Sequence, residues 1–370
     1  MSRFVFVLDA GASFDAKAPL ASNFMDKARL LLRSGFLPGQ DVSAFSLVFK
    51  AREALKAAHS KANLDLTDIE ALFGAFEMAS LFGRLGSLSE QEVDSLPSAM
   101  RRLISRTVEL SMEFPVLPAP SAERIGSRMR YQGRTGPYPM ILPPANYEPF
   151  AKMLATKAKG RLSDVSVITF NYDLGTDYAL HFTGIPFSYG LEPGADNALD
   201  LLKLHGSLNW GRCSKCRVIV PLDIPRCIQG IPIQDPEKVN IEVSQRLALL
   251  QHCGFPLPLE PVIVPPTWNK GAYHAQLGQV WKKAAAHLSE AEYIFIIGYS
   301  YPSTDEFFRY LYALGSIGEG WLERIVVFNP DPAAGERFRG LLGPLVAGKF
   351  TALTNTFEQA IPYIQGLDLS

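Results

Sequence analysis

Short apolar runs limit the fold of this chain more than any other feature. The strong runs are Phe4–Leu8, Val165–Phe170, Ile294–Ile297 and Ile325–Phe328, and the weaker ones are Leu201–Leu204 and Pro186–Tyr189. The strong runs lack a regular alternation of polar and apolar residues, so each is expected to be buried on both faces. Strands of this kind are typical of parallel sheets. The sequence therefore predicts an α/β fold, a Rossmann-like parallel sheet with helices on both faces.

Helical periodicity fills the segments between these runs. Apolar residues from Leu277 to Leu288 keep a three-four spacing, and Ser303 with Glu306 has the pattern of a capping box that opens a helix over Asp305–Leu314. Helical repeats also dominate residues 36–114. We expect a core of residues 1–35, 150–210 and 261–370, a mainly helical insertion over 36–149, and a small module over 211–260.

The charge balance of the chain bears on its partners. Its 36 basic and 37 acidic residues give a net charge of −1, which gives no support for strong nonspecific binding to nucleic acid or lipid. The insertion ends in a Pro-, Gly- and Arg-rich stretch over 115–146, whose Arg-rich loop 121–134 contains Arg124, Arg128, Arg130 and Arg134. This loop is either solvated, or a mobile lid or a contact for phosphate, nucleic acid or a partner chain.

The hydropathy of the chain favours a cytoplasmic location. No segment approaches the roughly 18 apolar residues of a membrane span. The run Phe4–Leu8 is too short for the apolar part of a signal peptide. We expect a cytoplasmic protein without a membrane segment.

Small and polar residues follow each strong run. They form the segments Gly11-Ala12-Ser13, Asn171-Tyr172-Asp173, Gly298-Tyr299-Ser300 and Asn329-Pro330-Asp331. Ligands of open α/β sheets bind outside the carboxyl ends of the strands, so these segments are expected to border one crevice. His205 and Gly206 follow a weaker run and belong at the same edge.

The order of these motifs resembles the sirtuin-like family, in particular its bacterial antiphage-defence branch. The family pattern runs from a Gly-Ala-Gly-x-Ser turn through Asn-x-Asp, His-Gly, a zinc knuckle and Gly-x-Ser to a late Asn. Its counterparts here are Ala10–Ser13, Asn171 and Asp173, His205 and Gly206, Cys213–Cys253, Gly298 to Ser300, and Asn329. Lys203–Trp210 and Pro261–Thr267 look especially like the bacterial branch.

The resemblance implies roles for these residues. Ala10, Gly11, Ala12 and Ser13 would hold the pyrophosphate of NAD, with Gly206 and Gly298 as further cofactor-binding residues. Asn171 and Asp173 would border the nicotinamide ribose and the carboxamide, and His205 would be the general base. Ser300 and Asn329 would contact the adenosine side.

The four cysteines lie close together and resemble a zinc knuckle. Cys213 and Cys216 form a Cys-x-x-Cys pair, but Cys227 is isolated and Cys253 follows His252 directly. Adjacent residues rarely both bind one tetrahedral ion, so Cys213, Cys216, Cys227 and Cys253 are the expected ligands of a structural zinc. The alternative is a knuckle that has lost its metal and keeps reduced thiols.

The resemblance implies an NAD hydrolase that releases nicotinamide and ADP-ribose as the effector of an antiphage system. It would be controlled by oligomerisation or by a partner such as an ATPase, a short Argonaute or a nucleotide-sensing protein. One alternative is a catalytically weak sensor or scaffold that binds NAD or ADP-ribose. Another is an NAD-dependent protein deacylase, for which the helical insertion has no use.

Asp9 departs from the family pattern, which has a glycine at this position. A carboxylate beside a diphosphate is unfavourable unless it points away or pairs with a cation. We therefore expect NAD binding to be weakened or redirected relative to the family, or activity to depend on a partner or assembly.

Overall fold

The structure is a computed structural model that describes residues 3–59, 64–117, 140–192, 196–264, 277–301, 306–315 and 321–368. The Arg-rich loop 121–134 and the capping residue Ser303 lie outside the described residues. Within the described part of the chain, no helix is long and apolar enough to cross a membrane.

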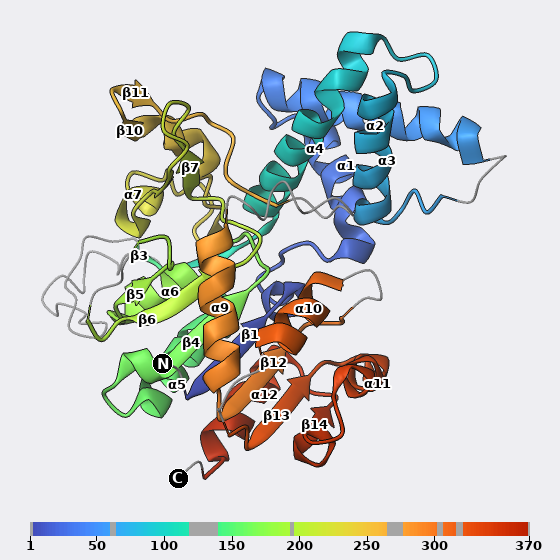
Figure 1. Cartoon of the computed structure of the whole chain (residues 1–370). Helices are drawn as coiled ribbons and strands as arrows, with labels where there is room; N and C mark the ends of the chain where they lie inside the picture. The colour runs from blue at the N-terminus through green and yellow to red at the C-terminus, as the bar shows by residue number, and fades with distance from the viewer. Residues whose placement is uncertain are drawn as a thin grey trace, which may run out of the picture.

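A seven-stranded parallel sheet forms the centre of the molecule (Figure 1). Its strands are β1 (Phe4–Leu8), β4 (Val165–Thr169), β5 (Phe187–Ser188), β6 (Leu199–Lys203), β12 (Tyr293–Ile297), β13 (Arg324–Phe328) and β14 (Phe350–Leu353), in the order β14-β13-β12-β1-β4-β6-β5. The central strand β1 pairs with β12 on one side and β4 on the other. The chain first builds outward from β1 through β4 and then returns to the other side at β12, so a topological switch point lies at β1.

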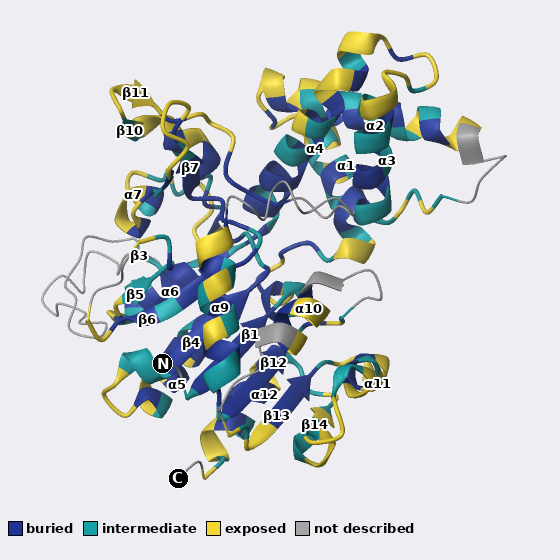
Figure 2. Ribbon diagram, in the orientation of Figure 1, coloured by how far each residue is buried: buried dark blue, intermediate teal, exposed yellow. Residues whose placement is uncertain are grey.

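Helices cover both faces of this sheet, and the alternating side chains of β1 feed two separate cores. Phe4, Phe6 and Leu8 pack under α5 (Tyr147–Ala158), α6 (Gly175–Thr183) and α12 (Phe357–Gly366). Val5 and Val7 pack under α9 (Gly278–Glu290), α10 (Glu306–Gly315) and α11 (Pro332–Leu341). All five residues of β1 are buried (Figure 2). The predicted fold class is confirmed, and so are all the predicted strands. The edge strand β14 was not predicted, because its residues are only partly buried and form no apolar run.

Four helices form a separate bundle above the sheet in Figure 1. They are α1 (Phe24–Ser34), α2 (Gly39–His59), α3 (Ile69–Phe82) and α4 (Glu90–Ser111), and they share one core. A capping box of Ser89 and Glu92 fixes the start of α4. The packed bundle begins with Phe24, earlier than the boundary at residue 36 that was drawn from the sequence.

A buried ionic cluster fastens this bundle to a distant segment. Arg106 on α4 is only 2% exposed and contacts Asp41 of α2, Glu109 and Glu242 at 2.8, 2.6 and 2.6 Å. The Glu109 carboxylate in turn accepts hydrogen bonds from the backbone N–H groups of Val243 and Ser244. Because each buried charge has partners, the cluster ties α2 and α4 to residues 242–244.

The remaining elements are short. They are β2 (Phe114–Leu117), β3 (Met140–Ile141), β7 (Trp210–Arg212), β8 (Ile219–Pro221), α7 (Ile224–Ile228), β9 (Lys238–Val239), β10 (Gln251–His252) and β11 (Phe255–Pro256), with single 3₁₀ turns η1 (Ala10–Ser13), η2 (Ala21–Asn23), η4 (Leu162–Asp164), η5 (Ser244–Leu249) and η6 (Ala347–Lys349). The hairpins β7–β8 and β10–β11 form the small module. It lies beside the bundle in Figure 1.

Candidate functional site

One cavity of about 840 Å³ lies at the carboxyl ends of the strands, between the sheet and the helical bundle. Its lining comes from the segments that follow β1, β4, β6, β12, β13 and β14, and from Ile69, Glu70, Ile104 and Val108 of the bundle. The volume lies within the range of about 300–1,000 Å³ that is usual for small-molecule sites. The predicted residues that line it are Ala10, Gly11, Ser13, Asn171, Asp173, His205, Gly298, Ser300 and Asn329.

The middle of the cavity floor is made of backbone. The amide of Gly11 donates to the carbonyl oxygen of Gly298 over 3.0 Å, which joins the turns after β1 and β12. A Cβ on Gly11 would lie 2.6 Å from that oxygen, and a Cβ on Gly298 would lie 2.4 Å from the nitrogen of Ala12. Gly298 also has a φ of +69°, which favours glycine. Both positions therefore require glycine for the two turns to meet.

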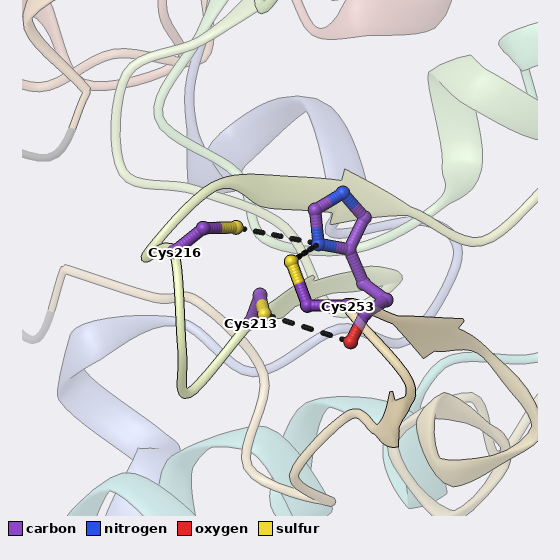
Figure 3. A group of neighbouring side chains, drawn as sticks. Cys213, Cys216 and Cys253 are labelled. Carbon is purple, nitrogen blue, oxygen red and sulfur yellow. Dashed lines mark hydrogen bonds between the residues drawn. The ribbon is translucent and has the colours of Figure 1, made fainter.

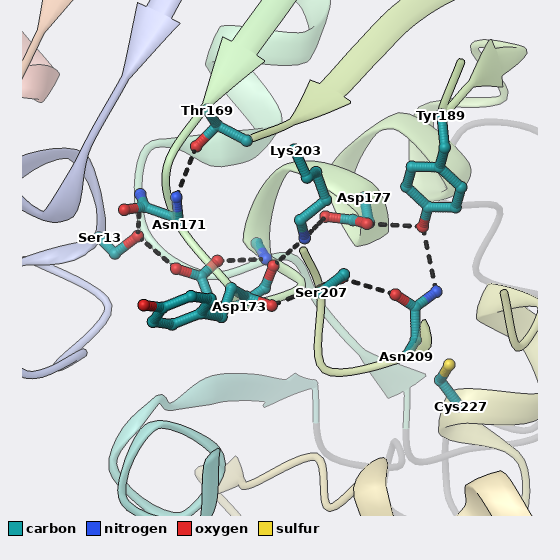
Figure 4. A network of polar contacts seen from close by, with 12 residues as sticks. Ser13, Thr169, Asn171, Asp173, Asp177, Tyr189, Lys203, Ser207, Asn209 and Cys227 are labelled. Carbon is teal, nitrogen blue, oxygen red and sulfur yellow. Dashed lines mark hydrogen bonds and ion pairs between the residues drawn. The ribbon is translucent and has the colours of Figure 1, made fainter. Parts of the chain in front are cut away.

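Ser13 holds the side-chain amide of Asn171 in one orientation (Figure 4). The Nδ2 group of Asn171 donates to the Ser13 hydroxyl and to the backbone oxygen of Asp9, both over 3.0 Å. A carbonyl oxygen can only accept, so a flipped amide would place two acceptors against each other at Asp9. Both Nδ2 hydrogens are thus in use, and Oδ1 is the part of the Asn171 amide left to bind a ligand. Oδ1 is an acceptor.

Asp173 and Tyr147 complete the hydrogen bonding of Ser13. The Ser13 hydroxyl donates to Asp173 Oδ2 over 2.7 Å, so its contact of 2.6 Å with the Tyr147 hydroxyl is one in which Tyr147 donates. Asp173 Oδ1 accepts from the amide of Gly175. Asp173 is 6% exposed, and burial raises the pKa of its carboxyl, while the charge of Lys203 acts in the opposite direction. Asp173 therefore orients Ser13 at the cavity wall.

His205 lies in an aromatic part of the cavity wall. Its ring centroid is 5.0 Å from that of Phe170 and 6.2 Å from that of Tyr172. The backbone oxygen of His205 accepts from Val264, whose own oxygen accepts from the Tyr172 hydroxyl, each over 2.7 Å. These contacts fix the His205 turn against the turn that carries Asn171.

Two predicted cofactor-binding residues do not line the cavity. Ala12 is fully buried in the core under the sheet. Gly206 has a φ of +81°, and a Cβ there would lie 2.0 Å from the backbone oxygen of Val262. Gly206 thus allows the segment 262–264 to lie against the His205 turn, and contributes to the site only through packing.

The charge of the cavity lining is negative. Its carboxylates are Asp9, Asp15, Glu70, Asp173 and Asp331, and no lysine or arginine occurs among the described lining residues. Arg337 lies close by, where it donates to the backbone oxygen of Ser300 and to Asp331. Asp9 gives no side-chain cap to η1, although it precedes that turn. A diphosphate in this cavity would depend on backbone N–H groups rather than on lysine or arginine side chains of the described lining.

Three of the four predicted metal ligands come together in the small module (Figure 3). The donor atoms of Cys213, Cys216, His252 and Cys253 all lie within 4.8 Å of one another. A tetrahedral zinc site needs ligand atoms about 3.5–3.8 Å apart, so this group fits the ion. A hydrogen bond from the backbone of Cys216 lowers the pKa of the Cys213 thiol to about 6, which favours the thiolate form that binds metals.

The prediction that Cys227 completes this group was wrong. Cys227 is fully buried in the core under the sheet, where its Sγ donates to the backbone oxygen of Leu222 and burial raises its pKa. His252 lies in the group instead, with Nδ1 at 3.3 Å from Cys216 Sγ. The left-handed backbone of Cys253, with a φ of 53°, lets two adjacent side chains turn toward one point.

Comparisons with known proteins complete the description of the site. No protein-family model matches the chain, and no curated protein matches it. Among solved structures, a Sir2 homologue in complex with NAD is similar at 14% identity and a TM-score of 0.39, over 98% of this chain and 88% of that chain. The structure of Sir2Tm bound to a propionylated peptide is similar at 11% identity and a TM-score of 0.37, over 98% and 90%. Both TM-scores are low, so the fold assignment stands on this chain's own sheet topology.

Proposed function

We propose that the chain is a sirtuin-like NAD glycohydrolase that cleaves NAD to nicotinamide and ADP-ribose. The observation that carries this proposal is that Ser13, Asn171 and His205, which follow three different strands, line one cavity. These residues belong to the motifs on which the resemblance to the sirtuin-like family rests, and their arrangement in space agrees with that resemblance.

The layout of the cavity suits a dinucleotide. Asn171 and His205 lie on the β4 and β6 side of β1, whereas Ser300 and Asn329 lie on the β12 and β13 side. Dinucleotides bind across the switch point of an α/β sheet, with one nucleoside on each side. We assign the nicotinamide riboside to the Asn171 side and the adenosine to the Asn329 side, with the diphosphate over the Gly11–Gly298 floor.

The chemistry follows from the groups on the Asn171 side. The bond between C1′ of the ribose and the nicotinamide nitrogen breaks, and its electron pair stays on the nicotinamide, which leaves as a neutral molecule. Asn171 Oδ1 accepts a hydrogen bond from a water and aims its oxygen at C1′. His205 takes the proton of that water as the new C1′–O bond forms, and ADP-ribose results.

We further propose that the enzyme is the effector of a bacterial antiphage system, held inactive by a partner or by oligomerisation until infection. Uncontrolled loss of NAD would harm the host cell, so such an activity requires control. Support comes from Lys203–Trp210 and Pro261–Val264, the latter being the described part of the second segment that resembles the defence branch. The bundle is a suitable point of control, since Ile69, Ile104 and Val108 belong to the cavity wall.

The charge of the cavity favours a second candidate. A lining with five carboxylates, and without lysine or arginine among the described residues, binds a diphosphate weakly. A catalytically weak sensor or scaffold for NAD or ADP-ribose would tolerate this charge. The sensor proposal predicts that ADP-ribose binds without any turnover of NAD.

Nicotinamide release tests the two proposals directly. Purified protein is assayed with free NAD, alone and with the products of neighbouring genes, beside the variants His205→Ala and Asn171→Ala. The NADase proposal expects turnover that both variants lose, whereas His181→Ala, outside the cavity lining, retains it. Full turnover by both site variants would refute the mechanism. Inactivity in every condition, together with measurable ADP-ribose binding, would favour the sensor.

A further inference from the structure

Lys203 is buried directly behind the turn that carries Asn171 and Asp173. It is the last residue of β6, two residues before His205, and it is 1% exposed. Its Nζ group donates to the backbone oxygen of Asp173, and to Oδ2 of Asp177 over 2.9 Å (Figure 4). A lysine is almost never fully buried unless it is paired, so these two contacts are what allow Lys203 to be buried.

The contacts of Lys203 continue into a chain of buried polar groups. Asp177, which is 1% exposed, also accepts from the Tyr189 hydroxyl over 2.6 Å. That hydroxyl accepts from Asn209 Nδ2 over 3.1 Å, and Asn209 Oδ1 accepts from the Ser207 hydroxyl over 2.7 Å. Lys203 and this chain therefore connect the turn of Asn171 and Asp173 with the segment that follows His205.

The backbone of the turn that carries Asn171 and Asp173 is held by donors from the His205 side. The oxygen of Tyr172 accepts from the amide of Leu208 over 3.1 Å, and the oxygen of Asp173 accepts from Lys203. Both partners come from β6 or the loop after it. The position of Asn171 is thus set from the His205 side of the cavity.

Lys203 also acts on the charge of Asp173. Burial and the neighbouring carboxylate of Asp177 raise the pKa of Asp173, and the ammonium of Lys203 is the main opposing charge. Ser13 also contacts this carboxylate, and Tyr147 contacts Ser13, but neither carries a charge. An ionised Asp173 can only accept, so Ser13 donates its proton to Oδ2 and the Ser13 oxygen is left to accept from Asn171 Nδ2, as observed.

We propose that Lys203 is a positioning residue: it holds the turn of Asn171 and keeps Asp173 the acceptor that orients Ser13 and, through it, the Asn171 amide. The assignment rests on the proposed hydrolase function. It does not follow from burial alone, since an apolar pair of similar volume could fill the same space, and replacing a buried ion pair in this way is often neutral for stability.

The test compares Lys203→Met, Lys203→Arg and the double variant Lys203→Met/Asp177→Leu with the exposed control Lys282→Met. The double variant removes both members of the Lys203–Asp177 ion pair, so neither is left buried without the other, and the destabilisation of a broken pair is avoided. We expect kcat for nicotinamide release to fall at least about thirtyfold in both Met variants, with KM changed less than about threefold. The acidic limb of the kcat profile should move about one pH unit upward in Lys203→Met, and Lys203→Arg should recover part of the loss.

Hydrogen exchange gives a readout that does not depend on turnover. In the double variant, amides of residues 170–175 should exchange about tenfold faster than in the wild type, while those of α4 and of the Lys282→Met protein stay unchanged. Unchanged exchange in 170–175 would overturn the proposal whether or not the wild type hydrolyses NAD. If the double variant exchanges faster but the wild type releases no nicotinamide, the positioning role of Lys203 stands. The proposed hydrolase function is then the part that fails. A double variant with normal kcat and pH profile would also overturn it.

Discussion

The hydroxyl of Ser13 donates to Asp173 Oδ2 over 2.7 Å and accepts from Asn171 Nδ2 over 3.0 Å. A buried carboxylate thereby fixes the direction of an amide that borders the cavity. The carbonyl oxygen of that amide is the group left to act on a ligand, so the chemistry of the site depends on the hydrogen bonds that Ser13 makes with Asp173 and Asn171.

Tyr147→Phe should weaken this arrangement without breaking the fold. The change removes the hydrogen bond that Tyr147 donates to Ser13, and a lost buried partner costs about 1–3 kcal/mol of stability. We expect nicotinamide release to fall about tenfold. Kinetics and thermal unfolding check this against Tyr310→Phe, whose ring is 59% exposed. Wild-type turnover by Tyr147→Phe would show that Ser13 needs no third partner.

Asp173→Asn should lower the activity and make the protein more stable. Burial raises the pKa of Asp173, so the stability that its protonated form contributes is present below the unfolded pKa of about 3.9 and is lost as the pH rises through the folded pKa. Asparagine does not titrate, so the variant should unfold with a flatter pH dependence above about pH 4. Its amide would donate toward Ser13, and turnover should drop at least about a hundredfold. Denaturant melts from pH 4 to pH 8 measure the first effect; a curve parallel to that of the wild type would contradict it.

Asp9→Gly should tighten NAD binding. Asp9 lines the cavity, and its removal takes one negative charge away from the proposed path of the diphosphate. At a few ångströms near a protein surface such a charge is worth about 1–2 kcal/mol, so we expect affinity to rise about tenfold. Calorimetry in an inactive His205→Ala background measures this, and Asp9→Asn separates charge from space. Equal affinities for all three proteins would mean that the carboxylate does not face the diphosphate.

His252→Ala should lower the zinc content of the protein, whereas Cys227→Ser should not. The structure places His252 in the group with Cys213 and puts Cys227 elsewhere in the core. Elemental analysis of proteins purified with zinc should find about one ion per chain in the wild type and in Cys227→Ser. The reverse pattern would restore the ligand set of four cysteines.

Arg106→Leu should destabilise the bundle strongly. It would leave the buried carboxylates of Asp41 and Glu109 without their main partner, which costs about 3–5 kcal/mol. Lys50→Met is the matched control, because the exposed pair of Lys50 and Glu92 is worth only about 0–1 kcal/mol. Denaturant unfolding compares them, and equal midpoints would show that the cluster carries no stability.

Much of the core was predictable because its signals are local. The apolar runs and the polar residues that end them are properties of a few neighbouring residues. They predict the sheet and most of the residues around the cavity. The roles of Tyr147 and Lys203 could not be predicted in this way. Tyr147 lies 134 positions from Ser13, and nothing in the sequence around either residue marks that contact.

Two other features depended on backbone and packing details that a single sequence does not reveal. His252 is not expected as a metal ligand from the sequence, because adjacent residues rarely both bind one ion. The left-handed backbone of Cys253 lets both side chains turn toward the same point. The apolar stripes of α3 and α4 predict a core, and they do form one, yet Ile69 and Ile104 also line the cavity. A stripe that packs and a stripe that encloses a ligand have the same sequence pattern.

The contact between Gly11 and Gly298 divides the cavity into a part that can vary and a part that cannot. Any side chain at either position would push the turns apart, so mutation has almost no means of reshaping the floor. The wall from the bundle consists of apolar side chains such as Ile69 and Val108, which other apolar side chains of similar volume can replace without moving the two turns. Descendants of this chain could therefore acquire new ligands or new control through the bundle while the floor stays the same.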